Sequence, residues 1–178
     1  MMGVLPWFVP GVVLSMAIAS FLGRRVGQIL AVHPGVAWAI LVGFGVIVSA
    51  TLTPLHGALN LAATGIGTCD FSRIGPAPIE ELIRLDETSL NVVLFIPLGV
   101  AIGFVRRSRP RGTLILAAGA LPFAIEAIQL VVPVLDRGCQ SADVVDNLTG
   151  LLIGIAIGMG LMFLRRRDGS RLRPEDSH

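Results

Sequence analysis

The chain has 178 residues, of which 53% are hydrophobic and only 15% are charged. A soluble domain carries about a quarter charged residues, so this composition excludes an ordinary soluble domain and indicates a polytopic membrane protein. The formal net charge of +2 is too small to argue for nucleic acid as a partner.

Five apolar segments follow one another along the chain and predict an all-α membrane bundle of five transmembrane helices. A helix needs about 20 residues to cross a hydrocarbon core of about 30 Å, and four of the segments reach that length. The third is short unless it begins upstream, near Thr88. The segments cover residues 5–23, 29–53, 91–105, 113–134 and 143–164.

Arginines follow the first, third and fifth segments and predict the orientation of the bundle. Cytoplasmic loops are enriched in basic residues, so we expect the N-terminus outside and the C-terminus inside. No arginine precedes the first segment, which disfavours a cleaved signal peptide. The loops at about 54–88 and 135–142 then lie outside. The arginines stand at positions 24–25, within 106–111 and at 165–167.

The long outside loop contains a stretch, residues 78–85, that suits a short amphipathic helix. Pro78 can occupy its first turn, and Glu80 and Glu81 favour the positive end of the helix dipole. Its apolar side chains share one face that can lie on the outer leaflet. The loop can serve as a binding element or lid, or as a plain surface cap, and the sequence leaves both open.

The two cysteines, Cys69 and Cys139, fall one in each outside loop. An external compartment permits disulfides, so we favour a bridge that ties the long loop to the segment before the last helix. Two free thiols too far apart to join are the alternative. A zinc site is not expected, because His33 and His56 lack ligand spacing relative to the cysteines.

Glycines at intervals of four predict close helix packing in two segments. The pattern appears at Gly99 and Gly103 in the third segment and at Gly150, Gly154 and Gly158 in the last. Small residues let helix backbones approach each other closely in a membrane. We therefore expect both glycine faces to point into the bundle.

Polar residues open the last helix. Asp143 and Asn147 continue its glycine stripe at helical spacing, so they should point into the bundle as well. Asp146 lies about 60° off the stripe, and its direction stays ambiguous. Carboxylates at a helix N-terminus are also explained by capping and the helix dipole, without any function.

The fourth segment carries Glu126 and Gln129, whose spacing of three places them on one face. Glu126 is the only carboxylate well inside an apolar segment. A carboxylate at membrane depth is costly and is usually paired or functional. Arg137 or Asn91 could supply a structural partner, but we favour a functional role.

These polar groups should lie at one level, because the alternating helix directions bring them together near the outer membrane face. Polar residues with separate structural roles would not need to share a depth. The sequence therefore predicts a site there. Its candidate residues are Asn91, Glu126, Gln129, Arg137, Asp143, Asp146 and Asn147.

The same residues carry a family likeness. The stretch from Asn91 to Gly99, then Glu126-x-x-Gln129, then Arg137 followed by Asp143, Asn147 and Gly150 together resemble the VanZ-like family. The likeness covers about 51–160, and the Arg-x-Cys-x-x-x-Asp-x-x-Asp-Asn form resembles its actinobacterial branch. Many members carry Asn-Leu-x-Pro-Phe in the long loop. Here Asn60-Leu61 is followed by other residues, so we assign that stretch no role.

The resemblance implies an integral protein of the cell envelope and cell membrane. The family's founding member is associated with low-level resistance to teicoplanin, a glycopeptide with a lipid tail. The resemblance names no cofactor and no settled activity, and we leave both open. It suggests a VanZ-like domain in 51–164. The two helices in 1–50 carry no membrane-embedded charge and are expected to be scaffold, and the charged tail in 165–178 is expected to be cytoplasmic and disordered.

Three functions compete for this site. As an enzyme, Glu126 and Asp143 would act as acid, base or metal-binding carboxylates on a lipid-linked phosphate or cell-wall precursor, with Arg137 on the phosphate. As a binding protein, the same cluster would hold a lipid head group or a lipoglycopeptide without turnover. As a structural network, Glu126, Arg137 and Asp143 would hold the bundle together. We favour a ligand-handling site and leave catalysis open.

Overall fold

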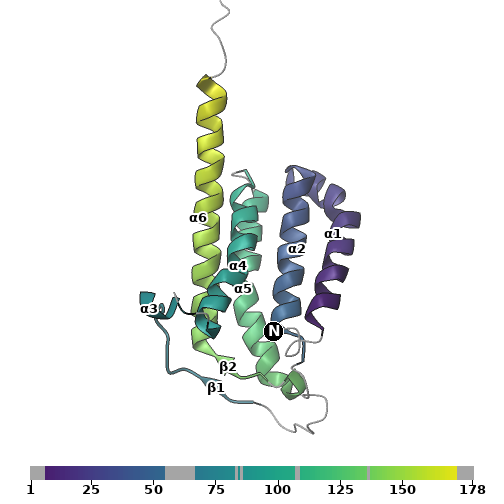
Figure 1. Cartoon of the computed structure of the whole chain (residues 1–178). Helices are drawn as coiled ribbons and strands as arrows, with labels where there is room; N and C mark the ends of the chain where they lie inside the picture. Colours follow the sequence, from purple (N-terminus) through teal and green to yellow (C-terminus); the bar gives the residue numbers. More distant parts are fainter. Residues whose placement is uncertain are drawn as a thin grey trace, which may run out of the picture.

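The computed structural model describes residues 7–54, 67–82, 84, 86–106, 109–135 and 137–171. They form a bundle of helices with a small strand pair at one end, which confirms the all-α prediction (Figure 1). The helices are α1 (Phe8–Leu30), α2 (Pro34–Thr51), α3 (Ile79–Leu82), α4 (Glu87–Gly103), α5 (Arg109–Val131) and α6 (Ser141–Arg171). The strands are β1 (Cys69–Asp70) and β2 (Cys139–Gln140), and a 3-10 turn covers Pro133–Leu135.

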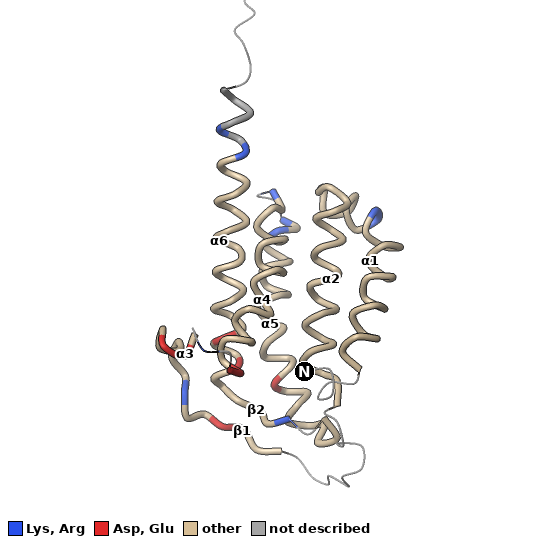
Figure 2. The backbone as a smooth tube through the Cα atoms, viewed as in Figure 1, with Lys and Arg blue, Asp and Glu red and all other residues tan. Residues whose placement is uncertain are grey.

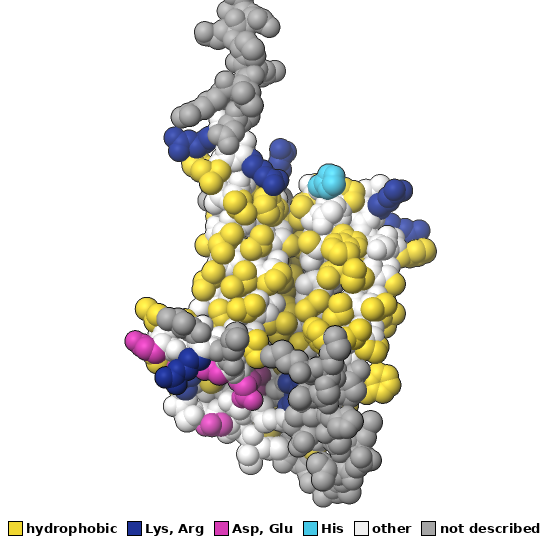
Figure 3. All heavy atoms as spheres, viewed as in Figure 1, with side chains coloured by type: hydrophobic (Ala, Val, Ile, Leu, Met, Phe, Trp, Pro, Cys, Tyr) yellow, Lys and Arg dark blue, Asp and Glu magenta, His cyan; other side chains and the backbone are white. Residues whose placement is uncertain are grey.

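Four helices, α1, α2, α5 and α6, are long and apolar enough to cross a membrane. The fifth predicted span, α4, has 17 residues and is shorter than the other four. It nevertheless lies at the centre of the bundle, where Phe95, Leu98 and Ile102 are fully buried. Large apolar side chains remain exposed on the outer faces of the long helices, as a lipid environment allows (Figure 3).

The start of α4 is fixed by a capping box rather than by Asn91, where the apolar pattern begins. The Asp86 side chain accepts a hydrogen bond from the backbone N–H of Ser89, and the Ser89 hydroxyl lies 3.2 Å from the backbone nitrogen of Asp86. These reciprocal bonds satisfy donors that a helix start leaves unpaired. The helix therefore begins four residues earlier than its apolar pattern predicts, at Glu87.

Two helices extend beyond their predicted ends. The first, α1, continues through Arg24 and Arg25 to Leu30 and is closed by Ala31 in the left-handed conformation. The last, α6, continues to Arg171, so the prediction of a disordered tail is wrong for residues 165–171. Arginine is a good helix former, and helices continue through it once they leave the apolar core. Residues 172–178 lie outside the described part of the chain.

The amphipathic stretch of the long loop is helical over a shorter range than predicted. The helix α3 spans Ile79–Leu82, with Glu80 and Glu81 in its first turn as expected. The last residues of the predicted stretch, 83 and 85, and the loop residues 55–66 lie outside the described residues. The Asn60-Leu61 element and His56 fall in that range.

The glycine faces of α4 and α6 point into the bundle, as predicted, and the structure shows that they meet each other. A Cβ atom on Gly99 would lie 2.9 Å from the Cα of Gly154, and one on Gly103 would lie 2.8 Å from the Cα of Gly158. A Cβ atom on Gly150 would collide with the carbonyl of Val92. Only glycine permits this backbone approach, so the five glycines set the distance between the two helices.

The two ends of the bundle differ in charge (Figure 2). Arginines gather at the end that carries the α1–α2 turn, the α4–α5 turn and the outer part of α6, which we call the basic end. Asp and Glu gather at the opposite end, with the strands, α3 and the starts of α4 and α6, which we call the acidic end. The positive-inside rule predicts that the basic end is cytoplasmic.

Candidate functional site

A disulfide fixes the long loop to the acidic end of the bundle. Cys69 and Cys139 are bonded, with their Cα atoms 4.5 Å apart, and this confirms the predicted bridge. The same two residues pair in a short parallel ladder, in which Asp70 lies opposite Gln140. We call residues 69–75 the strap, because they cross the end of the bundle between the disulfide and α6.

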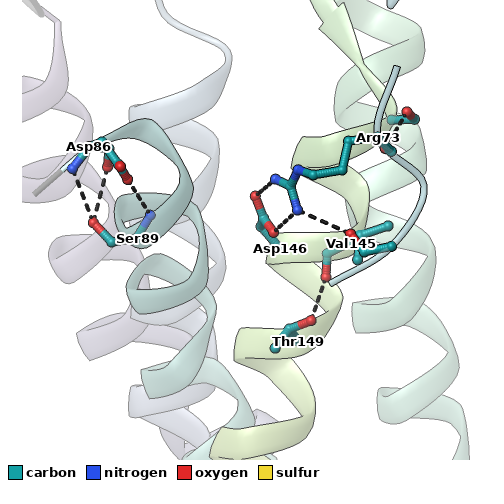
Figure 4. A network of polar contacts seen from close by, with 8 residues as sticks. Arg73, Asp86, Ser89, Val145, Asp146 and Thr149 are labelled. Atoms are coloured by element: carbon teal, nitrogen blue, oxygen red, sulfur yellow. Dashed lines mark hydrogen bonds and ion pairs between the residues drawn. The ribbon is translucent and has the colours of Figure 1, made fainter. Parts of the chain in front are cut away.

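The strap is also held by an ion pair with α6. The guanidinium of Arg73 binds both carboxylate oxygens of Asp146, with Nη1 3.0 Å from Oδ1 (Figure 4). The hydrogen bond with Asp146 raises the pKa of Arg73 above its ordinary value. The Ser141 hydroxyl donates to the backbone carbonyl of Arg73 at 2.7 Å, and Nη1 of Arg73 also donates to the carbonyl of Gly75.

The carboxylate of Asp146 therefore faces inward and is paired with Arg73. It is 1% exposed, although its helical phase left its direction ambiguous in the sequence. Its partner Arg73 was not among the candidate residues. A signal for it existed, since a carboxylate this close to a membrane helix needs a cation, and the loop 54–88 offers only Arg73 and Arg84.

Glu126 and Gln129 share a buried face of α5, as their spacing predicts, and each is 5% exposed. Glu126 accepts a hydrogen bond from the backbone N–H of Gln140 at 2.7 Å. Gln129 donates from Nε2 to the backbone carbonyl of Thr51 at 3.0 Å. Arg137 and Asn91 were possible structural partners of Glu126, but its hydrogen bond in the described part of the chain comes from a strand backbone. The two residues thus connect α5 with β2 and with the end of α2.

Arg137 lies between the strand β2 and the end of α2, half-buried. Its Nη2 donates to the backbone carbonyl of Ala50 at 2.8 Å, and its Nε is buried without a hydrogen-bond partner among the described residues. Burial lowers the pKa of Arg137 below its ordinary value, opposed by the charges of Asp143 and Glu87. Within the described part of the chain, Arg137 forms no salt bridge with a carboxylate.

Asp143, Asn91 and Asn147 accompany Arg137. The half-buried Asp143 lies within electrostatic range of Arg137, and the amide of Asn91 is within hydrogen-bonding reach of its carboxyl. Asn147, one helical turn from Asp143, is 1% exposed, and its Oδ1 has no hydrogen-bond partner among the described residues. We call these three residues together with Arg137 the Arg137 cluster: Arg137, Asp143, Asn91 and Asn147.

All the predicted site residues therefore lie at the acidic end, but they differ in how far their hydrogen bonds are satisfied within the described part of the protein. Asp146 and Glu126 have strong partners within the protein. The Arg137 cluster combines a cation, a carboxylate and two amides, and part of its hydrogen-bonding capacity is unused. Such a set can bind a phosphate or carboxylate through the guanidinium, and hydroxyl or amide groups through the other side chains.

Comparison with known proteins identifies one related family. The family model described as VanZ/LLP1 matches residues 45–164. The matched region contains α4, α5, α6 as far as residue 164, the strap and all four residues of the Arg137 cluster. No curated protein and no solved structure matches the chain.

Proposed function

Because the chain belongs to the VanZ/LLP1 family and carries four helices able to cross a membrane, we propose that it is a multi-pass protein of the cell membrane. Its function in this proposal is to bind the anionic head group of a lipophilic ligand at the outer face, through the Arg137 cluster. The ligand classes are a lipid-linked cell-wall intermediate and a lipoglycopeptide such as teicoplanin. Capture of the latter would give a role in glycopeptide resistance.

The bonding of Arg137 carries this proposal. A cation removed from water is costly unless a carboxylate compensates it, and proteins seldom keep one without a use. Among the described residues, Arg137 has a main-chain carbonyl as its hydrogen-bond partner, and its buried Nε has none. An anionic ligand would supply the compensating charge and can accept two parallel hydrogen bonds from a guanidinium.

The neighbouring side chains favour a head group that is more than a phosphate. The carboxylate of Asp143 can accept hydrogen bonds from hydroxyl groups, and the amides of Asn91 and Asn147 can both donate and accept. Sugars and peptides offer these groups. The buried Oδ1 of Asn147 would gain a donor from such a ligand.

Two other functions fit the polar residues less well. In the enzyme alternative Glu126 would exchange protons with a substrate, but it is 5% exposed and already accepts the N–H of Gln140. The structural alternative fits Asp146, whose carboxylate is taken up by Arg73. It fits Arg137 poorly, since a structural cation would be expected to meet a carboxylate.

The direct test is ligand binding by the full chain in lipid nanodiscs, with an isoprenoid-linked phosphate and teicoplanin as probes. Arg137→Gln should weaken binding of the responsive probe by about tenfold or more, as expected when a charged hydrogen bond is lost. Arg84→Gln is the matched control. It removes the same positive charge, but from an exposed arginine at the same end of the bundle.

Equal affinity of wild type and Arg137→Gln, with both proteins folded by circular dichroism, would contradict the proposal. Equal losses in the two variants would mean that surface charge alone attracts the probe. Mass spectrometry of the probe after incubation addresses the enzyme alternative, which requires a chemically changed product that wild type forms and Glu126→Gln does not.

A further inference from the structure

A hollow lined by described residues lies at the basic end, away from the Arg137 cluster. It has a volume of about 420 Å³. The helix α4 ends at Gly103, whereas α6 continues to Arg171, and the hollow is lined by residues of the α1–α2 turn, of the segment after α4 and of α6. The lining residues are Ala31, Val32, His33, Val36, Phe104, Arg106, Met162 and Arg165.

The hollow combines an apolar floor with a cationic rim. Its floor consists of aliphatic side chains, Met162 and the ring of Phe104. The rim carries Arg106 and Arg165, and the described lining residues include no carboxylate. The guanidinium carbon of Arg165 lies 5.5 Å from the centre of the Phe104 ring, which holds this arginine beside the hollow.

His33 adds a hydrogen-bond donor to the same rim. It caps the N-terminus of α2, and its Nδ1 accepts a hydrogen bond from the backbone N–H of Gly35 at 3.1 Å. A neutral imidazole whose Nδ1 accepts carries its proton on Nε2, so the outer edge of the ring can donate. The N-terminus of α2 also contributes a positive partial charge at this point.

We propose that this hollow binds the head group of an anionic phospholipid from the leaflet at the basic end. The phosphate would lie between Arg106, Arg165 and His33, and the glycerol and upper acyl chains would cover the apolar floor. A free phosphate ion matches the rim but not the floor, and so the lipid is the better occupant. Basic pockets between membrane helices on the cytoplasmic side are suited to such head groups. This site is independent of the proposed outer site.

Lipid retention by the purified full chain tests the proposal. The protein is reconstituted with equal amounts of phosphatidylglycerol and phosphatidylcholine, extracted in mild detergent and examined by native mass spectrometry. Wild type should retain phosphatidylglycerol selectively. The double variant Arg106→Gln/Arg165→Gln should lower this selectivity by about 25-fold, at about fivefold for each arginine near a membrane surface.

Two further variants separate the hollow from general surface charge. Arg24→Gln/Arg109→Gln removes two exposed arginines at the same end that do not line the hollow, and it should keep the selectivity. Val36→Phe fills the floor without a change in charge and should lower retention. Equal losses in both double variants, or unchanged retention in Val36→Phe, would overturn the proposal.

A competition experiment distinguishes the source of the phosphate. Inorganic phosphate at millimolar concentration should leave the retained phosphatidylglycerol in place. Its complete displacement would overturn the lipid proposal and indicate a soluble anion as the occupant.

Discussion

The strap and the Arg137 cluster lie at the same end of the bundle, but their arginines differ in their partners. In the strap, Arg73 meets Asp146 with two hydrogen bonds, and a disulfide fixes the chain nearby. In the cluster, Arg137 donates to a main-chain carbonyl and meets no carboxylate in a salt bridge within the described part of the chain. Polar residues at one membrane depth are therefore not one functional set. Their hydrogen bonds separate those that hold the fold from those available to a ligand.

The largest loss of stability should follow Arg73→Ala. This change leaves Asp146, which is 1% exposed, as a buried carboxylate without its cation. Removing one partner of a fully buried ion pair costs about 3–5 kcal/mol, and because the Arg73 side chain is 25% exposed, we expect a loss at or below the lower end of that range. Denaturant unfolding in micelles would measure the change. The double variant Arg73→Ala/Asp146→Ala should recover part of the loss, and simple addition of the two single effects would show that the pair is not coupled.

Loss of the disulfide should have the next largest effect. The bond joins residues separated by 70 positions, and Cys69→Ser/Cys139→Ser should lower the free energy of unfolding by about 2–4 kcal/mol. Wild type treated with reductant should unfold at the same denaturant concentration as this variant. A stable double serine variant would mean that the Arg73–Asp146 pair holds the strap without the bridge.

Glu126→Gln should have a smaller effect, because the amide oxygen of glutamine can still accept the N–H of Gln140. Only the charge assistance of that hydrogen bond is lost, which corresponds to about 1 kcal/mol. Unfolding and probe binding should be measured on the same samples. Loss of all binding with unchanged stability would mean that Glu126 takes part in ligand binding rather than in holding the fold.

Arg137→Gln should change stability least, by about 1 kcal/mol or less in either direction. The variant loses the hydrogen bond to Ala50 and also loses the cost of half-burying a cation that forms no salt bridge among the described residues, and these terms oppose each other. Its effect should appear in ligand binding instead. A large destabilisation in the same unfolding assay would place Arg137 with Arg73, as part of the fold.

Much of the architecture follows from local sequence patterns. Apolar length predicted the helices, and the spacing of Gly99, Gly103, Gly150, Gly154 and Gly158 predicted which faces of α4 and α6 point into the bundle, although not that the two faces meet. The placement of one cysteine in each outside loop predicted the disulfide. Helix ends were less accurate, since the Asp86–Ser89 capping box and the helix-forming arginines act outside the apolar pattern.

The bonding within the site could not be read from the sequence, for two physical reasons. Arg73 and Asp146 are 73 residues apart, and no local pattern connects them. The partner of Glu126 is a backbone N–H, which every residue except proline carries, so no side chain marks it. The sequence could identify which groups converge at the acidic end but not which of them are already paired.

The short central helix has a mechanical consequence for the surrounding lipid. With 17 residues, α4 is about 26 Å long at 1.5 Å per residue, several ångströms less than the apolar thickness of an average bilayer. Its glycine contacts with α6 prevent it from shifting along its axis to compensate. The leaflets should therefore be compressed beside α4, with water drawn toward its capped start. A thicker membrane would resist this deformation, so lipid chain length should tune how readily an amphiphile reaches the acidic end.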